Sequence, residues 1–190
     1  MDVELLKEEL QKRLPTKRYD HVLRVTATAV ALAEKYAIPV WKAEQAALFH
    51  DIAKFMDKAE LQAFLVQGNE DSRLLSFHHE LWHAPVGAII AQDEFGMMDI
   101  DILNAIRYHT TGRAKMSPLE KLIYVADMIE PGRVFPGVEA LRTIAEEDLD
   151  LAMEACIYQS VQFLIHKRAP VFPDSIDCYN EFVNTKGKVK

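Results

Sequence analysis

Apolar residues recur at helical spacing along most of this chain, and the period-two alternation typical of half-buried strands is missing almost throughout. In the first segment, Val3, Leu6, Leu10 and Leu14 would share one face of a helix that Pro15 stops. The chain of 190 residues has no repeat, no low-complexity tract and no evident linker. We therefore predict an all-α helical bundle that forms a single domain over residues 1–190.

Turn and cap residues divide this pattern into separate helices. Gly96 and the Pro131-Gly132 pair would each end a helix, and Ser117-Pro118 is typical of an N-cap followed by the first helical residue. After the first helix, His21 would open the second. The predicted helices cover about 21–39, 41–55, 58–66, 85–95, 99–109, 118–130, 138–146, 148–166 and 175–185. Asp99 or Asp101 would cap the helix that runs to residue 109. The polar, histidine-rich stretch from about 70 to 83 receives no assignment.

The net charge of −7 argues against general binding to nucleic acid, which depends on a basic face. A small anionic substrate stays compatible, since a metal and a few cationic side chains can reverse the potential locally. Of the two cysteines, Cys156 lies in an apolar helical stripe and should pack in the core. The acidic N-terminus does not resemble a signal peptide, and no apolar run approaches the roughly 18 residues of a membrane span. We expect a soluble cytoplasmic protein with no membrane partner.

Residues that could hold a metal are spread over distant parts of the chain: His21, the adjacent pair His50-Asp51, His83, His109 and Asp127. Imidazole nitrogens and carboxylate oxygens from different segments are the ligands that a borderline divalent metal prefers. Asp127 lies in the apolar stretch LIYVADMI, where an unpaired carboxylate would cost several kcal/mol. It should therefore be paired with a buried arginine or lysine, hydrogen-bonded, or bound to a metal.

Two further features are compatible with phosphate chemistry. If residues 41–55 form one helix, Lys54 shares a face with His50, so its ammonium group could pair with a phosphate oxygen near the metal. The alternative is a solvated lysine that balances Asp51. The loop Thr110-Thr111-Gly112-Arg113 offers hydroxyls, backbone N–H groups and a guanidinium to phosphates, although such loops are also ordinary helix connections.

Residues 79–83 spell H-E-x-x-H, the zinc-protease motif. That chemistry needs both histidines on one continuous helix, and we expect Pro85 to force Ala84 out of helical geometry. We interpret the match as accidental. His78 and His79 should lie on the surface, and His166 near the negative end of a helix dipole.

The order of His21, His50-Asp51 and Asp127 on an all-helical chain resembles the HD-domain superfamily of metal-dependent phosphohydrolases. More specifically, FHDIAK, His83 before Pro85, YHTTGR and YVADMIEPGR resemble the YqeK family of bacterial HD proteins over essentially the whole chain. This resemblance implies symmetrical hydrolysis of a phosphoanhydride bond in diadenosine tetraphosphate, or a related dinucleoside polyphosphate, to two ADP.

The same resemblance implies a metal, most simply iron with manganese or zinc as alternatives, held by His21, His50, Asp51 and Asp127. It implies catalytic roles for Asp51, Lys54, His83 and His109. The implied nucleotide contacts are His21, Asp51, Lys54, His83, His109, Thr110, Thr111, Gly112, Asp127, Arg133, Pro173, Asp174 and Ser175. Ser175 replaces an expected threonine and keeps the hydroxyl. The metal-site core would span about residues 16–135, with the C-terminal helices completing the substrate pocket.

Several points stay open at the level of sequence. His83 and His109 could donate a proton to the leaving ADP oxygen, or they could bind a second metal. A nucleoside mono- or triphosphatase, or a cyclic-nucleotide phosphodiesterase, would use the same ligands, because substrate choice depends on pocket shape. A non-catalytic HD-like interaction module is a third alternative, although such modules usually lose metal ligands. A homodimer is compatible with the sequence.

Overall fold

The computed structural model describes residues 3–185, and all regular structure within that range is helical. In chain order, its elements are α1 Val3–Arg13, α2 Thr16–Lys35, α3 Val40–Phe49, α4 Lys58–Gln67, the 3-10 helices η1 Ser72–Ser76 and η2 His79–Leu81, α5 His83–Asp93, α6 Ile100–Arg107, α7 Pro118–Ile129, α8 Val138–Ala145, α9 Leu149–His166 and α10 Pro173–Thr185. The all-α prediction is confirmed. None of the described helices combines the length and the apolar character needed to cross a lipid bilayer.

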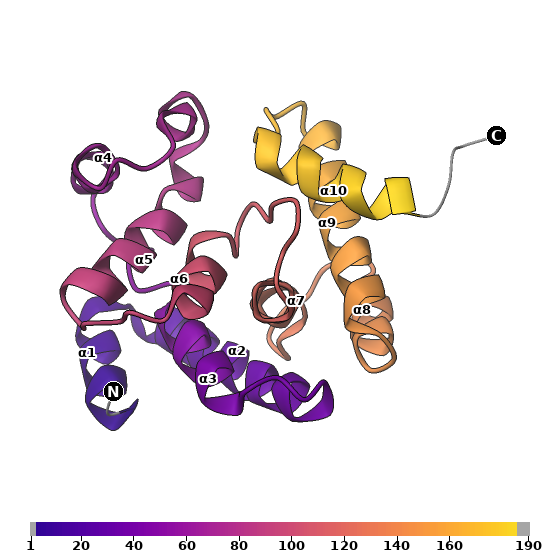
Figure 1. Ribbon diagram of the computed structural model, residues 1–190, viewed down its shortest axis with the longest axis horizontal. Helices are drawn as coiled ribbons and strands as arrows, with labels where there is room; N and C mark the ends of the chain where they lie inside the picture. The colour runs from indigo at the N-terminus through magenta and orange to yellow at the C-terminus, as the bar shows by residue number, and fades with distance from the viewer. Residues whose placement is uncertain (1–2, 186–190) are drawn as a thin grey trace.

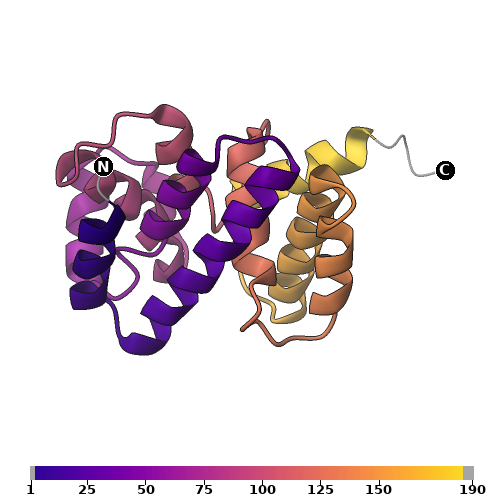
Figure 2. The ribbon, with the colours of Figure 1, turned by 90° about the horizontal axis from the view of Figure 1, so that it is seen from below.

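Helix α7 lies at the centre of the molecule (Figure 1). It contacts α2, α3 and α6 on one side and α8 and α9 on the other. Helices α8, α9 and α10 lie together beyond α7, away from α1 and the other N-terminal helices (Figures 1 and 2). Every segment that carries a predicted metal ligand therefore belongs to α7 or to the elements on its N-terminal side.

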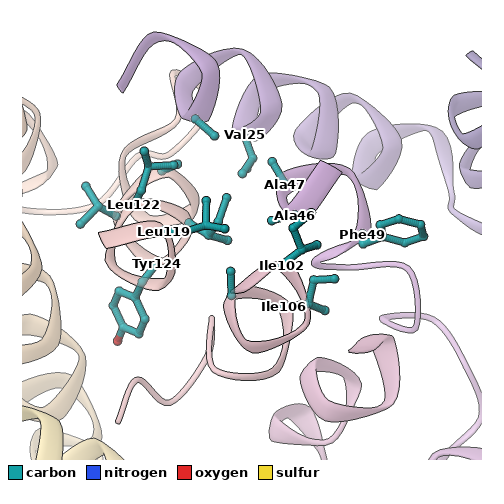
Figure 3. Packing of buried hydrophobic residues seen from close by; sticks show 14 of the residues in the cluster. Val25, Ala46, Ala47, Phe49, Ile102, Ile106, Leu119, Leu122 and Tyr124 are labelled. Atoms are coloured by element: carbon teal, nitrogen blue, oxygen red, sulfur yellow. The ribbon is translucent and has the colours of Figure 1, made fainter. Parts of the chain in front are cut away.

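The core between α2, α3, α6 and α7 is apolar and closely packed. Val25 of α2 faces Ala46 and Ala47 of α3, and Ile106 of α6 and Leu122 of α7 fill the remaining space (Figure 3). All five side chains are fully buried. The small alanines on α3 leave room for its close packing against α2, while each buried isoleucine, leucine or valine contributes about 1.5–3 kcal/mol of transfer free energy. This packing fixes α2, which contains His21, and the C-terminal end of α3, which His50 follows.

Cap residues explain several helix boundaries. In α7, the Ser117 hydroxyl accepts a hydrogen bond from the Glu120 amide, and the Glu120 carboxylate accepts one from the Ser117 amide at 2.7 Å. This reciprocal pair is a capping box, and Pro118 takes the first helical position. Asp99, rather than Asp101, caps α6 by accepting from two first-turn amides.

Three predicted boundaries differ from the structure in ways that affect the candidate site. Helix α2 begins at Thr16, so His21 lies inside the helix and does not open it. Helix α3 ends at Phe49 instead of near residue 55, and residues 50–56 form successive turns in which the Lys54 amide donates to the Asp51 carbonyl. Helix α6 ends at Arg107, which leaves His109 in the turn that follows.

Candidate metal centre

Asp51 lies at the centre of four histidines that come from four different segments. Its Oδ2 atom is 2.9 Å from His50 Nε2 and 3.6 Å from His21 Nε2. On the other side, Oδ1 is 3.2 Å from His83 Nε2 and 4.0 Å from His109 Nε2. The carboxylate has no exposed surface, and all four rings are buried. Residues predicted from distant parts of the sequence are thus brought together.

The outer nitrogen of each ring has a defined acceptor. In three rings, Nδ1 donates to the backbone carbonyl of the residue three positions earlier, at 2.6 Å for His50, 2.7 Å for His83 and 2.8 Å for His109. In the fourth ring, His21 Nδ1 donates to the Glu130 carboxylate at 3.0 Å. Because these oxygens can only accept, Nδ1 carries a hydrogen in each ring, and Nε2 is the nitrogen that faces the buried aspartate.

Asp127 completes the side of the cluster formed by His21 and His50. Its Oδ1 atom is 3.1 Å from His21 Nε2, and the three residues offer ligand atoms within 4.8 Å of one another. The Arg133 guanidinium pairs with the same carboxylate and donates to the Asp127 carbonyl at 2.8 Å. Burial opposes ionisation of Asp127, but the polar contact with His21 and the charge of Arg133 hold its pKa far below the usual range. The carboxylate is therefore charged, and it is both ion-paired and part of the histidine cluster.

A second group of ligand atoms lies on the other side, formed by His50, Asp51 and His109. Here His83 Nε2 and His109 Nε2 are 3.1 Å apart. Two lone pairs that face each other at this distance repel unless a proton or a cation lies between them. Asp51 contributes to both sides of the cluster through its two oxygens, so the arrangement offers two neighbouring positions for a cation.

Burial and charge together set the protonation states. Burial favours the neutral form of Asp51, yet His50 and His83 hold its pKa well below the usual range. Burial also lowers the pKa of His83 and lowers that of His109 much further, which leaves both rings neutral near pH 7. For His50, burial lowers the pKa, but the adjacent aspartate more than offsets this and raises it. The negative charge of Asp51 thus favours the protonated form of His50.

The donor set fits a transition metal. His21 Nε2, His50 Nε2 and both carboxylate oxygens of Asp51 are buried and lie within ion-pair distance of neighbouring groups, but they form no hydrogen bond of good geometry. Leaving such an atom unsatisfied costs about 1–3 kcal/mol, and more for a charged group. A cation coordinated by these atoms would remove that cost. Imidazole nitrogens together with carboxylate oxygens suit iron, manganese or zinc.

Two charged residues of the centre were not predicted from the sequence. Arg18 pairs its guanidinium with Asp51 Oδ2, and its Nε atom is buried without a hydrogen-bond partner. Its spacing of three residues from His21 places the two on one face of a helix, which was the available signal. Glu130, which is 1% exposed, follows the apolar α7 directly. A carboxylate at that position needs a partner for the same reason as Asp127, and this was the available signal.

Lys54 does not lie where the helical argument placed it. Because α3 ends at Phe49, residues 50 and 54 do not share a helical face, and the Lys54 ammonium lies 2.6 Å from Glu80 Oε2. The Lys54 side chain thereby connects to η2, the segment that immediately precedes His83. A contact between Lys54 and a substrate stays a prediction.

The H-E-x-x-H match does not form a protease site, as predicted. Residues 79–81 form a 3-10 helix and α5 begins only at His83, so the two histidines are not on one helix. His78 is exposed and His79 is partly exposed. The expectation for Ala84 was wrong, however, because this residue is helical. Pro85 is the third residue of α5, where a missing N–H removes no hydrogen bond within the helix.

The two segments predicted to contact nucleotide lie close together. Thr110 and Thr111 of the loop after His109 line a cavity of about 60 Å³ together with Phe172 and Asp174, at the start of α10. Pro173 and Ser175 belong to the first turn of that helix, and the Asp174 carboxylate accepts a hydrogen bond from Arg73 at 2.8 Å. The juxtaposition agrees with a shared role, while contact with a nucleotide stays a prediction.

Relatives of known type match nearly the whole chain. The HD domain family model matches residues 18–132. The symmetrical bis(5'-nucleosyl)-tetraphosphatase of Bacillus subtilis (strain 168) is 48% identical over 92% of this chain and 94% of its own length. The enzyme of that name from Staphylococcus aureus (strain NCTC 8325 / PS 47) is 40% identical over 100% and 99%, respectively. The crystal structure of a predicted HD superfamily hydrolase involved in NAD metabolism from Clostridium acetobutylicum matches with a TM-score of 0.93 at 36% identity, covering 97% of this chain and 98% of that one.

Proposed function

Since this chain belongs to the HD domain family, and within it to the symmetrical bis(5'-nucleosyl)-tetraphosphatases, we propose that its metal centre hydrolyses diadenosine tetraphosphate to two ADP. The observation that carries this proposal is the convergence of four imidazole Nε2 atoms on both oxygens of one buried aspartate, Asp51. A cluster of this kind is costly in a packed core, because each unsatisfied polar atom in it destabilises the fold.

The residues that would hold the metal are His21, His50, Asp51 and Asp127. A cation bound there supplies Lewis acidity, which lowers the pKa of a coordinated water from 15.7 toward about 7. We propose iron as the native metal, with manganese or zinc as alternatives. His83 and His109 would face a second cation position that shares Asp51.

The carboxylates and neutral rings have distinct roles toward the reacting water. Asp51 and Asp127 are charged, so their oxygens can accept hydrogen bonds from the water and orient it toward phosphorus. His83 and His109 present lone pairs because their hydrogens are on Nδ1. In this form they accept a proton or a cation. This argues against the sequence-based hypothesis that they donate a proton to the leaving ADP oxygen.

Three cationic side chains around the centre are each paired with a carboxylate: Arg18 with Asp51, Arg133 with Asp127, and Lys54 with Glu80. Once Asp51 and Asp127 serve as metal ligands, the guanidinium groups of Arg18 and Arg133 would be available to phosphate oxygens. Arginine suits this purpose because its fork of N–H donors matches two phosphate oxygens at once.

We propose that the C-terminal helices complete the substrate site of a single domain whose metal-binding core spans about residues 16–135. The cavity between Thr110 and Asp174 has a volume of only about 60 Å³. Ligand pockets usually measure about 300–1,000 Å³, so this cavity could take a phosphate but no nucleoside. The nucleosides would therefore lie outside it, against the 109–112 loop and the first turn of α10.

The direct test is product analysis with the purified protein and a series of metals. Diadenosine tetraphosphate should give ADP as the sole nucleotide product, and Asp51→Ala and Asp127→Ala should abolish turnover while the proteins stay helical by circular dichroism. Formation of AMP and ATP would contradict symmetrical cleavage. Near-normal hydrolysis by either variant would refute the proposed metal centre.

A further inference from the structure

His21 is held differently from the other three histidines of the centre. His50, His83 and His109 lie in turns or at a helix end, where nearby backbone carbonyls lack a partner within a helix. His21 lies inside α2, whose interior carbonyls are already bonded to amides four residues further on. Its Nδ1–H therefore needs an acceptor from another part of the chain, and Glu130 provides it.

We infer that Glu130 is a positioning residue for the metal ligand His21, and that Arg24 holds Glu130 in place for this role. The inference rests on the proposed metal centre. A carboxylate that accepts from Nδ1–H fixes the tautomer and the orientation of the ring, and it makes Nε2 a stronger donor to a cation than a backbone carbonyl would. Glu130 thus influences the metal affinity of the centre without being a ligand itself.

The Glu130 carboxylate has partners on both oxygens. Oε1 accepts from His21 Nδ1 at 3.0 Å. Oε2 accepts from Arg24 Nε at 2.6 Å and from the Gly132 amide at 2.6 Å. The side chain is 2% exposed, so water cannot substitute for these donors. Rotation of the carboxylate would break several bonds at once, and the His21 ring is therefore held by a rigid group.

Gly132 gives a second way to disturb this arrangement without changing any of its charged groups. A Cβ atom at residue 132 would lie 2.6–2.8 Å from the Arg24 guanidinium. The backbone there is not in the left-handed region, so an alanine would introduce no conformational strain. Because the arginine side chain is flexible, Gly132→Ala should push Arg24 away from Glu130 at a small cost in stability.

Helix α7 also offers a matched control at its other end. Glu120 is likewise buried, accepts from Arg113 Nε at 2.6 Å, and accepts from a backbone amide at 2.7 Å. None of its hydrogen bonds involves a histidine. Replacing Glu120 therefore reproduces the loss of a buried, arginine-paired carboxylate without altering the ring of a metal ligand.

The experiment measures metal affinity in the metal-free protein of residues 1–190 by titration with Mn²⁺ and Zn²⁺ against a chelator. Glu130→Ala should weaken binding about 10–100-fold, the usual effect of removing such a partner. Glu130→Gln should recover part of the affinity, because its amide oxygen can still accept from Nδ1–H, and Gly132→Ala should show a partial loss. Glu120→Ala should lower the melting temperature and leave the affinity unchanged. Wild-type affinity in Glu130→Ala, or an equal loss in Glu120→Ala, would overturn the inference.

A second readout separates this inference from the proposed function. Imidazole ¹⁵N chemical shifts in the metal-free protein should show His21 protonated on Nδ1, and Glu130→Ala should convert it to a mixture of tautomers. If the wild-type protein binds metal but does not cleave diadenosine tetraphosphate, the proposed function fails and the role of Glu130 is unaffected. An unchanged His21 tautomer in Glu130→Ala would refute the positioning role in either case.

Discussion

Gly112 lies so close to α10 that a single added methyl group should be measurable. A Cβ atom at this residue would lie 2.9 Å from Cys178 Sγ and 3.5 Å from Met116 Sδ. The backbone angle φ is +62°, which costs a non-glycine residue about 1–2 kcal/mol. Overpacking against the buried cysteine adds about 1–3 kcal/mol. Gly112→Ala should therefore lower the free energy of unfolding by about 2–5 kcal/mol.

A double-mutant cycle with Cys178→Ala separates the two contributions. The cysteine variant alone loses a buried sulfur and should cost about 1–2 kcal/mol. In the double variant the steric overlap with Sγ disappears while the left-handed backbone cost stays. The two single effects should thus exceed the double effect by about 1–3 kcal/mol in urea unfolding followed by circular dichroism. Additivity within about 0.5 kcal/mol would show that the contact with Cys178 contributes nothing and that backbone conformation alone requires glycine.

Three other outcomes follow from the charges of the centre. Folding lowers the pKa values of Asp51, Asp127 and Glu130, the last to about 2. The metal-free protein should therefore lose stability as the pH falls below about 4.5. Urea midpoints that stay constant down to pH 3 would contradict this. Arg18→Ala removes the guanidinium from a buried carboxylate and should cost roughly 3 kcal/mol without metal. Bound Mn²⁺ should raise the melting temperature of this variant more than that of the wild type, and an equal rise would refute the idea that the arginine substitutes for a cation. The Glu80→Ala variant should keep its metal and change KM by less than about fivefold, because the exposed ion pair between Glu80 and Lys54 contributes about 0–1 kcal/mol. Loss of turnover in this variant would instead favour the zinc-protease interpretation.

The fold class and most helix boundaries could be predicted because they depend on local patterns. Apolar periodicity, Pro15 and the Ser117-Pro118 cap act over a few residues, and the structure follows them. The end of α3 could not be predicted in this way. The apolar pattern continues through Phe55, and the chain leaves the helix at His50, where the ring and the adjacent carboxylate are drawn into the buried centre.

The central residues of the site were also accessible from the sequence, since histidines and aspartates in this order resemble a known family. Arg18 and Glu130 were not, because an arginine or a glutamate near a helix end is usually solvated. Their burial depends on which helices pack together. The contact of Glu130 with His21 joins residues 109 positions apart, and no local pattern encodes it.

Three of the four rings are aimed by the main chain of their own turn, and this has a consequence for how the centre can vary. A substitution at residue 47, 80 or 106 changes a side chain but cannot delete the carbonyl that orients the following histidine. The orientation of these rings therefore does not depend on which side chain occupies residue 47, 80 or 106. The orientation of His21 depends on the side chain of Glu130 instead. Natural variation should therefore be far narrower at residue 130 than at residues 47, 80 and 106.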